Sequence, residues 1–333
     1  MSESSDYSPG PWAGHDFGTA RKQYDQYAGR RYAAASSAGV SATDLVPPRI
    51  ATDSSHPLLI ACDVSGSMGG WPATIFAKLP YLDHEIRTEY LGQDAEVCFA
   101  AISDTGDSYP FQIQPFAAGT QMKERLQKLV ITDGGAGPGY CCEAHGLAML
   151  YALRNVDTPR AVRRPPFIII TDEMPYDPVS KNDANGYAKV KLEGHRASIA
   201  EIMEKLRTRY SVYLVIKPYG SECLKGDKLH GTTKTVYECW ERLVGADRIA
   251  LLSEADRVVD VIFGLLAKDA GQVEYFRKEI EGRQRQDQVD TVYKALKTVH
   301  ALPSDAGEPD ASKPSGRSIM LRPTAGKPTK KLI

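Results

Sequence analysis

The sequence predicts an α/β protein with a doubly wound, mainly parallel six-stranded sheet and helices on both faces. Apolar segments of strand length alternate along the chain with segments whose apolar residues recur at helical spacing. Two of the apolar segments, 58–62 and 166–171, lead directly into an aspartate. Because ligands of open α/β sheets bind beyond the carboxyl ends of the strands, these two aspartates mark a candidate site.

The elements follow in order from the apolar pattern. After the first strand, which ends at Asp63, helical spacing extends over 71–91, and Pro80 should bend or split this helix. The segment 111–116 alternates apolar and polar residues, which is typical of a half-exposed edge strand. The other predicted strands cover 95–102, 166–171, 211–216 and 248–252. The other predicted helices cover 119–130, 143–154, 199–209 and 254–268.

Composition divides the chain into four segments. Residues 1–55 lack long periodic apolar runs, so we predict an irregular N-terminal arm, followed by a folded domain over 56–268. Amphipathic patterns over 269–302 predict a C-terminal helical extension that clasps the domain or binds a partner. Residues 303–333 are rich in Pro, Gly and Ser and basic near their end, which predicts a disordered basic tail.

Charge and hydropathy exclude several classes of function. The formal net charge of -1 gives no overall attraction to nucleic acid or to anionic membranes, so contact with nucleic acid is expected only weakly, through the basic tail. The chain shows neither a signal-peptide pattern nor an apolar run near the roughly 20 residues of a membrane span, and we expect a cytoplasmic protein. The six cysteines lack zinc-type spacing and are expected to be reduced.

The loop after the first strand carries the pattern of a cation site. Asp63, Ser65 and Ser67 place oxygen-bearing side chains at alternate positions, and such a loop can direct them at one hard cation of the Mg²⁺ or Mn²⁺ kind. Gly66 allows the loop to turn tightly. Asp172 ends the second strand and is expected to face the same pocket. The alternative is that the loop only caps the following helix.

The segment 63–67, Asp-Val-Ser-Gly-Ser, matches the Asp-x-Ser-x-Ser signature of von Willebrand factor type A (vWA) domains, relatives of integrin I domains. The chain resembles this family over roughly 57–268. The resemblance implies a doubly wound sheet with a metal-ion-dependent adhesion site (MIDAS) made of three loops. By this resemblance Asp63, Ser65 and Ser67 form the first loop.

The other two loops depart from the family pattern. Asp172 stands in the third loop, where the resemblance implies a ligand that acts through water, and Glu173 replaces the usual glycine. The second loop should hold a threonine before a helix, but the chain offers the glycine-rich segment 134–139. The threonine's place falls near Cys141, and Glu143, one turn inward, is a candidate metal ligand instead. Glu143 could equally be a first-turn acid facing the helix dipole.

An acidic helix start of this kind resembles intracellular bacterial members of the family. That resemblance implies a non-enzymatic adaptor in which a partner carboxylate completes the shell of Mg²⁺ or Mn²⁺. Such members serve ring-forming AAA+ ATPases or bacterial stress and conflict systems, and an AAA+ ATPase is the preferred partner. No P-loop pattern occurs, so that ATPase would be another chain. The partner-binding rim is expected at Trp71, Cys141 and Glu173, although Trp71 could instead pack onto the sheet.

Two other functions remain open. A metal-dependent hydrolase could use the same acidic site, since a bound cation can activate water. The chain offers neither Gly-x-Ser-x-Gly nor His-Glu-x-x-His in its support. The third possibility is an oligomeric scaffold with a vestigial metal site, assembled through the C-terminal helices.

Overall fold

The computed structural model describes residues 41–132, 141–219, 224–225 and 228–300. The chain divides into two units, 1–300 and 301–333, and every described residue belongs to the first. Most of the predicted N-terminal arm, the glycine-rich segment 134–139 and the predicted basic tail lie outside the described residues.

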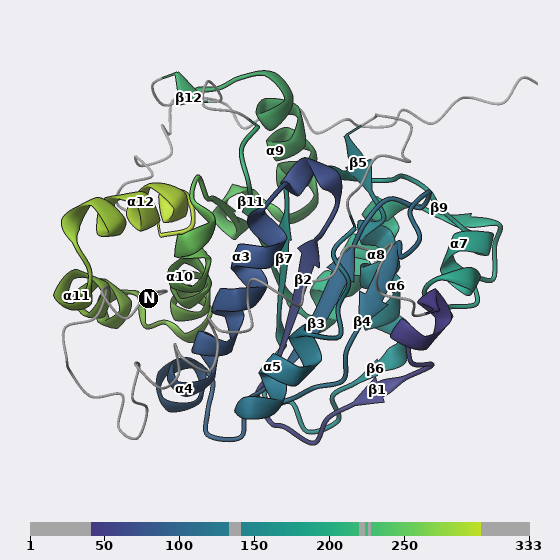
Figure 1. Cartoon of the computed structure of the whole chain (residues 1–333), viewed down its shortest axis with the longest axis horizontal. Coiled ribbons are helices and arrows are strands. Elements are labelled where there is room, and N and C mark those ends of the chain that lie inside the picture. Colours follow the sequence, from purple (N-terminus) through teal and green to yellow (C-terminus); the bar gives the residue numbers. More distant parts are fainter. Residues whose placement is uncertain (1–40, 133–140, 220–223, 226–227, 301–333) are drawn as a thin grey trace, which may run out of the picture. The chain divides into compact units, whose positions relative to one another are not determined.

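A six-stranded sheet forms the centre of the first unit, in the order β14-β11-β7-β2-β3-β4 (Figure 1). Five neighbouring strands run parallel, and β4 pairs antiparallel with β3 at one edge. The predicted α/β class and the six-stranded, mainly parallel sheet are therefore confirmed. The strands are β2 (Pro57–Asp63), β3 (Glu96–Ile102), β4 (Phe111–Ile113), β7 (Pro166–Thr171), β11 (Ser211–Ile216) and β14 (Ile249–Leu251).

Successive residues of a strand point to opposite sides of the sheet. Apolar residues stand at both sets of positions here, so both faces of the sheet are apolar. Leu58 and Ile60 of β2 belong to one buried cluster, and Leu59 and Ala61 to another. The first cluster includes residues of α3 (Trp71–Lys78), α5 (Thr120–Leu126) and α10 (Val258–Ala270). The second includes residues of α6 (His145–Asn155), α8 (Ile199–Arg209) and α9 (Gly231–Val244). Helices thus cover each face of the strands.

The helix predicted over 71–91 is divided, as expected from Pro80. After α3 come a 3-10 turn (Leu79–Tyr81), α4 (Leu82–Glu85) and a π-helical turn (Ile86–Tyr90). Pro80 lies in the 3-10 turn, where its missing N–H and its ring interrupt the α-helical hydrogen bonds.

The prediction for Glu143 as a helical residue is wrong. Helix α6 begins only at His145, and Glu143 lies in β5 (Cys142–Glu143), which pairs in parallel with β8 (Met174–Pro175). The backbone N–H of Tyr176 donates to the carbonyl of Glu143 at 3.0 Å. This long-range pairing fixes the segment before the helix in extended form, next to the third loop.

Some elements were not predicted. Helix α9 buries Val236, Trp240 and Val244 at helical spacing, so its signal was present in the sequence. Helix α7 (Lys181–Gly186) is short. Short strands are β1 (Ile50–Ala51), β6 (Val156–Asp157), β9 (Val179–Ser180), β10 (Arg196–Ala197), β12 (Leu224–Lys225) and β13 (Lys228–Leu229). Single 3-10 turns cover Ala42–Leu45, Gly66–Met68, Ala246–Arg248 and Ala255–Arg257. No helix in the described ranges has the length and apolar content needed to span a membrane.

The C-terminal helices α11 (Val273–Arg283) and α12 (Gln286–Leu296) pack against α10. Their apolar side chains join the cluster that contains β2 and α10, so the helices clasp the folded unit, as one of the two alternatives had it. Gly264 of α10 is the point of closest approach: a Cβ added there would lie 2.2 Å from a methyl carbon of Leu296.

We predict that Gly264→Ala lowers the free energy of unfolding by about 1–3 kcal/mol, because the added methyl group forces α10 and α12 apart. Chemical denaturation of the purified variant measures this. Gly282→Ala is the matched control, since an added Cβ at this exposed site in α11 meets nothing within 4 Å. It should stabilise the protein by about 0.5–1 kcal/mol through helix propensity. Equal effects of the two substitutions would contradict the packing of α12 on α10.

Candidate metal centre

Four neighbouring parallel strands bring polar side chains to one edge of the sheet. Asp63 is the last residue of β2, Asp172 follows β7, and Lys217 follows β11. Asp104 lies two residues beyond the end of β3. Because these strands are adjacent and parallel, their carboxyl ends open at the same edge. The fold therefore gathers residues that are up to 154 positions apart in the chain, from Asp63 to Lys217.

The carboxylate of Asp63 is buried and held on both oxygens. Its Oδ1 accepts hydrogen bonds from the backbone N–H of Ser65 at 2.9 Å and from the Ser65 hydroxyl at 2.6 Å. Its Oδ2 accepts from the hydroxyl of Thr171 at 2.8 Å. These contacts orient the carboxylate and connect the first loop to the end of β7.

The hydrogen bonds continue from the first loop to the third. The hydroxyl oxygens of Ser65 and Ser67 are 3.0 Å apart, and the Ser67 hydroxyl donates to Oδ1 of Asp172 at 2.9 Å. The four residues predicted to converge, Asp63, Ser65, Ser67 and Asp172, thus form one connected cluster. Ser67 is exposed whereas the others are buried, so the cluster opens to solvent at Ser67.

Glu143 adds a third buried carboxyl group. Its Oε2 has no hydrogen-bond partner among the described residues. Burial, together with the negative charge of Asp63, raises the pKa of Glu143 far above the ordinary carboxyl range. Burial and the negative charge of Asp172 raise the pKa of Asp63 in the same way. Among the described residues no positive group is placed where it would let both Asp63 and Glu143 ionise.

The residues predicted at the rim border this cluster. Glu173 is buried, and its carboxylate accepts a hydrogen bond from the Tyr219 hydroxyl at 2.8 Å. Trp71 is partly buried, packs against the core and has the ammonium nitrogen of Lys217 6.0 Å from its ring centroid. Trp71 thus packs onto the core, as one of the two alternatives had it, and its role toward a partner stays a prediction. Cys141 is partly exposed, and its carbonyl accepts from the N–H of Met174 at 3.0 Å.

The sequence analysis missed Lys217. Its ammonium group donates to Oδ2 of Asp172 and to the backbone carbonyl of Ser67, each at 2.7 Å. The signal was available, because Lys217 directly follows the predicted strand 211–216 and takes the same strand-end position as the aspartates. It was not predicted because the expected site residues at the strand ends were acidic.

Asp104 and Thr132 also lie near the site, and neither was predicted as part of it. Asp104 forms a turn, in which its Oδ1 accepts from the N–H of Gly106 at 2.6 Å, and its Oδ2 accepts from the Tyr176 hydroxyl at 2.6 Å. Thr132 is a threonine that approaches the first loop, where its hydroxyl donates to the carbonyl of Val64 at 2.9 Å. Its position before the glycine-rich segment, not at a helix entrance, hid it from the family pattern.

The donor set suits a hard cation. Within the described ranges no three His, Cys, Asp or Glu side chains form a ready-made metal cluster. The candidate centre relies on hydroxyl groups as well, from Ser65 and Ser67. Oxygen donors of this kind favour Mg²⁺ or Mn²⁺ over softer metals. Oε2 of Glu143, buried and without a hydrogen-bond partner among the described residues, is available to a further polar or charged group.

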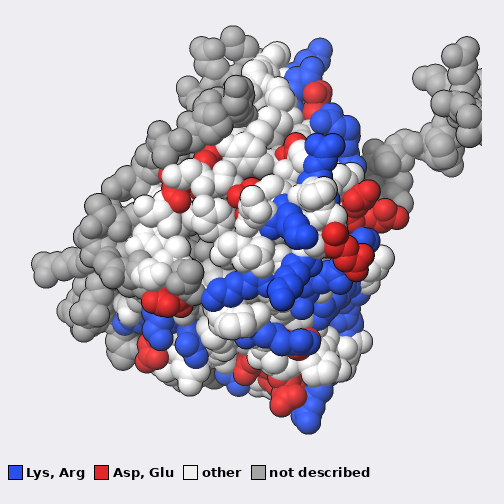
Figure 2. All heavy atoms as spheres, turned by 90° about the vertical axis from the view of Figure 1, so that its right-hand side faces the viewer, with Lys and Arg blue, Asp and Glu red and all other residues white. Residues whose placement is uncertain are grey.

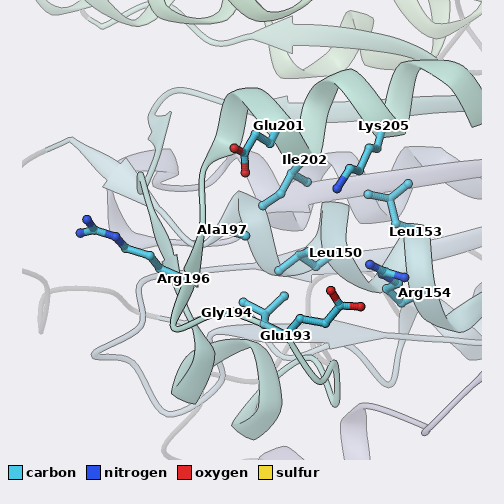
Figure 3. A pocket seen from close by; sticks show the side chains of 11 residues that line it. Leu150, Leu153, Arg154, Glu193, Gly194, Arg196, Ala197, Glu201, Ile202 and Lys205 are labelled. Carbon is cyan, nitrogen blue, oxygen red and sulfur yellow. The ribbon is translucent and has the colours of Figure 1, made fainter.

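A separate hollow lies between α6 and α8. It has a volume of about 260 Å³. Figure 2 shows Lys and Arg gathered in a band on the side of the molecule that lies to the right in Figure 1, with Asp and Glu beside them. In Figure 3, charged groups of both signs surround apolar Leu150 and Ile202. The mixed lining selects no class of ligand. The lining residues are Leu150, Leu153, Arg154, Leu192, Glu193, Gly194, Arg196, Ala197, Glu201, Ile202 and Lys205.

No protein-family model matches the chain, and no curated protein matches it either. Solved structures with a similar arrangement include the pilus adhesin SpaC from Lactobacillus rhamnosus GG in its open conformation, at 15% identity and a TM-score of 0.43, covering 67% of this chain and 30% of the adhesin. A second structure of SpaC gives 13% identity and a TM-score of 0.43, with coverages of 72% and 31%.

Proximal thread matrix protein 1 from the mussel byssus is also similar, at 12% identity and a TM-score of 0.40, covering 66% of this chain and 46% of the matrix protein. The chain thus spans less than half the length of these structures. Similarities of this size do not identify its function.

Metal-free protein should lose stability as the pH rises through the raised pKa of Asp63. The folded state holds a proton on this carboxyl up to about pH 7, whereas the unfolded state releases it near pH 4. In that window the folded state binds more protons, so the free energy of unfolding falls with rising pH, by about 1–3 kcal/mol. Asp63→Asn should remove this contribution.

Urea unfolding at pH 5 and pH 8 with a chelator present measures the difference between wild type and variant. Asp53→Asn is the control, because it removes an equal charge from a side chain that is 80% exposed and precedes the opposite end of β2. An identical pH dependence in wild type and Asp63→Asn would show that Asp63 ionises normally.

Proposed function

We propose that this chain is a doubly wound module of the vWA type that binds a partner's carboxylate through a divalent cation. The observation that carries the proposal is the connected cluster at the carboxyl edge of the sheet. There Asp63, Ser65, Ser67 and Asp172 are joined by hydrogen bonds, and the negative charge of Asp63 acts on Glu143, whose buried Oε2 has no hydrogen-bond partner among the described residues.

The cation would be held by Asp63, Ser65, Ser67 and Glu143, with Asp172 acting through water as the family resemblance implies. When bound, Mg²⁺ or Mn²⁺ supplies two positive charges and an open coordination position. Those charges offset the repulsion between buried Asp63 and Glu143, which otherwise favours protonation. Thr171 keeps the Asp63 carboxylate oriented by its hydrogen bond.

The proposed role is that of a non-enzymatic adaptor. A partner's acidic side chain would reach the cation from the solvent-exposed side at Ser67, between the rim residues Trp71, Cys141 and Glu173. The resemblance to intracellular bacterial family members favours an AAA+ ATPase as the partner and a cytoplasmic location. Both assignments are part of the proposal.

The packing of the C-terminal helices bears on the scaffold alternative. The apolar side chains of α11 and α12 are buried against α10 of the same chain. They are therefore not available as an assembly surface in this arrangement, which favours the adaptor over a scaffold assembled through these helices. The hydrolase alternative has no observation of its own in its favour, and it becomes an outcome of the experiment below.

We predict saturable binding of Mg²⁺ and Mn²⁺ to the metal-stripped protein, measured by titration calorimetry. Asp63→Asn should abolish it, because it removes the central charged ligand. Glu143→Gln should weaken it by roughly tenfold or more, since one charged ligand becomes neutral. Asp53→Asn, an equal loss of charge at the opposite end of β2, should bind as the wild type does.

Wild-type protein that binds neither cation at millimolar concentration would contradict the proposal and favour a vestigial site. Loss of binding in Asp53→Asn as well would show that the effect of Asp63→Asn is not local. Hydrolysis of phosphate esters or peptides that disappears in Asp63→Asn would make the site that of an enzyme.

A further inference from the structure

Lys217 is a positive charge that the chain itself delivers to the candidate metal centre. Its ammonium nitrogen lies 2.7 Å from Oδ2 of Asp172, a carboxylate that is fully buried. The opposite oxygen of that carboxylate accepts the hydroxyl of Ser67. Both carboxylate oxygens of Asp172 therefore have partners, and the positively charged partner is the ammonium group of Lys217.

Lys217 is held by specific contacts and differs from a solvated surface lysine. Its side chain is only 17% exposed. The ammonium group also donates to the backbone carbonyl of Ser67 at 2.7 Å. The ring of Tyr219 lies 5.7 Å from the nitrogen on one side, and that of Trp71 lies 6.0 Å away. Ammonium groups are attracted to aromatic faces at these distances.

The ammonium group of Lys217 does not neutralise all the carboxyl groups at the site. It contacts Asp172, whereas among the described residues Oε2 of Glu143 has no hydrogen-bond partner and Asp63 accepts hydrogen bonds from hydroxyl and backbone groups. A divalent cation beside Asp63 and Glu143 would lie close to the ammonium group and repel it, in a buried region where screening by water is weak. Lys217 and the metal therefore compete for Asp172.

We propose that Lys217 is an internal cation that pairs with Asp172 and that it turns to the partner's carboxylate when a divalent cation binds beside Asp63 and engages Asp172 through water. This inference rests on the proposed function. With a metal bound, the ammonium group of Lys217 would be repelled from Asp172 and would face the incoming acid at the open side near Ser67. The partner's carboxylate is thus bound by two positive groups, the metal and Lys217, between the rings of Trp71 and Tyr219.

Two measurable consequences follow from this competition. First, the metal alone should bind weakly, because it must displace an ammonium group from a buried carboxylate. Second, a carboxylate should strengthen metal binding, because it compensates the displaced ammonium group. Metal and carboxylate are then positively coupled, and by linkage each raises the affinity of the other by the same factor.

The test uses Lys217→Met in the full-length chain, which keeps an unbranched apolar stem and removes the charge. Mn²⁺ is titrated calorimetrically into wild type and variant in sodium chloride, and again in sodium acetate of equal ionic strength. In chloride the variant should bind Mn²⁺ more tightly, on the order of tenfold or more, because the competing charge is gone. Acetate should strengthen Mn²⁺ binding to wild type more than to the variant, in which only the metal is left to bind the carboxylate.

Two controls keep the result specific. Lys217→Arg retains a positive charge and should stay close to wild type. Lys205→Met removes an equal charge from an exposed position on α8 and should have no effect. Removing Lys217 also leaves Asp172 without its partner, so Lys217→Met should melt at a lower temperature without metal and gain more from Mn²⁺ than wild type does. A thermal scan with and without Mn²⁺ records this, and shows whether the variant is folded.

Weaker or equal Mn²⁺ binding by Lys217→Met, with wild type still binding, overturns the inference and leaves the proposed function standing. An acetate effect of the same size in wild type and Lys217→Met overturns the role of Lys217 toward the carboxylate. Absence of Mn²⁺ binding in both proteins overturns the proposed function itself, and the inference with it.

Discussion

Charge balance at the carboxyl edge of the sheet is the constraint on which the rest of this site depends. Asp63 and Asp172 are buried in one hydrogen-bonded cluster, the buried Glu143 is close enough for their charges to act on each other, and among the described residues the ammonium group of Lys217 contacts only Asp172. A buried carboxylate without a positive partner either takes up a proton or recruits a cation. The fold holds these groups together despite the repulsion between them, which favours either a proton or a cation at the site.

The scaffold that sustains this arrangement is the parallel sheet. Adjacent strands β2, β7 and β11 end at the same edge, which fixes the backbone of Asp63, Asp172 and Lys217. Apolar clusters on both faces hold the strands in register, and α11 and α12 extend one of these clusters through Gly264 of α10. The side chains at the edge are then oriented locally by short hydrogen bonds, such as that from Thr171 to Asp63.

Much of this could be predicted from the sequence because the signals were local. Strand β11 and helix α8 coincide with their predicted ranges, since β-branched runs and helical spacing are read within a few residues. The convergence of Asp63 and Asp172 followed from the rule that parallel strands end at one edge. Glu143 was misplaced because its extended form depends on pairing with Met174–Pro175, a long-range contact that local patterns do not encode.

Lys217 was missed for a different reason. Its position directly after a predicted strand could be read from the sequence, but a positive charge was not expected among the acidic strand ends. Anomalous diffraction from crystals of the full-length protein soaked in Mn²⁺ would show directly whether a metal binds beside Asp63. We expect a manganese peak about 2.1 Å from oxygens of Asp63 and Ser65, with the ammonium group of Lys217 moved away from Asp172. A map without a peak there, with Lys217 still bonded to Asp172, would contradict it.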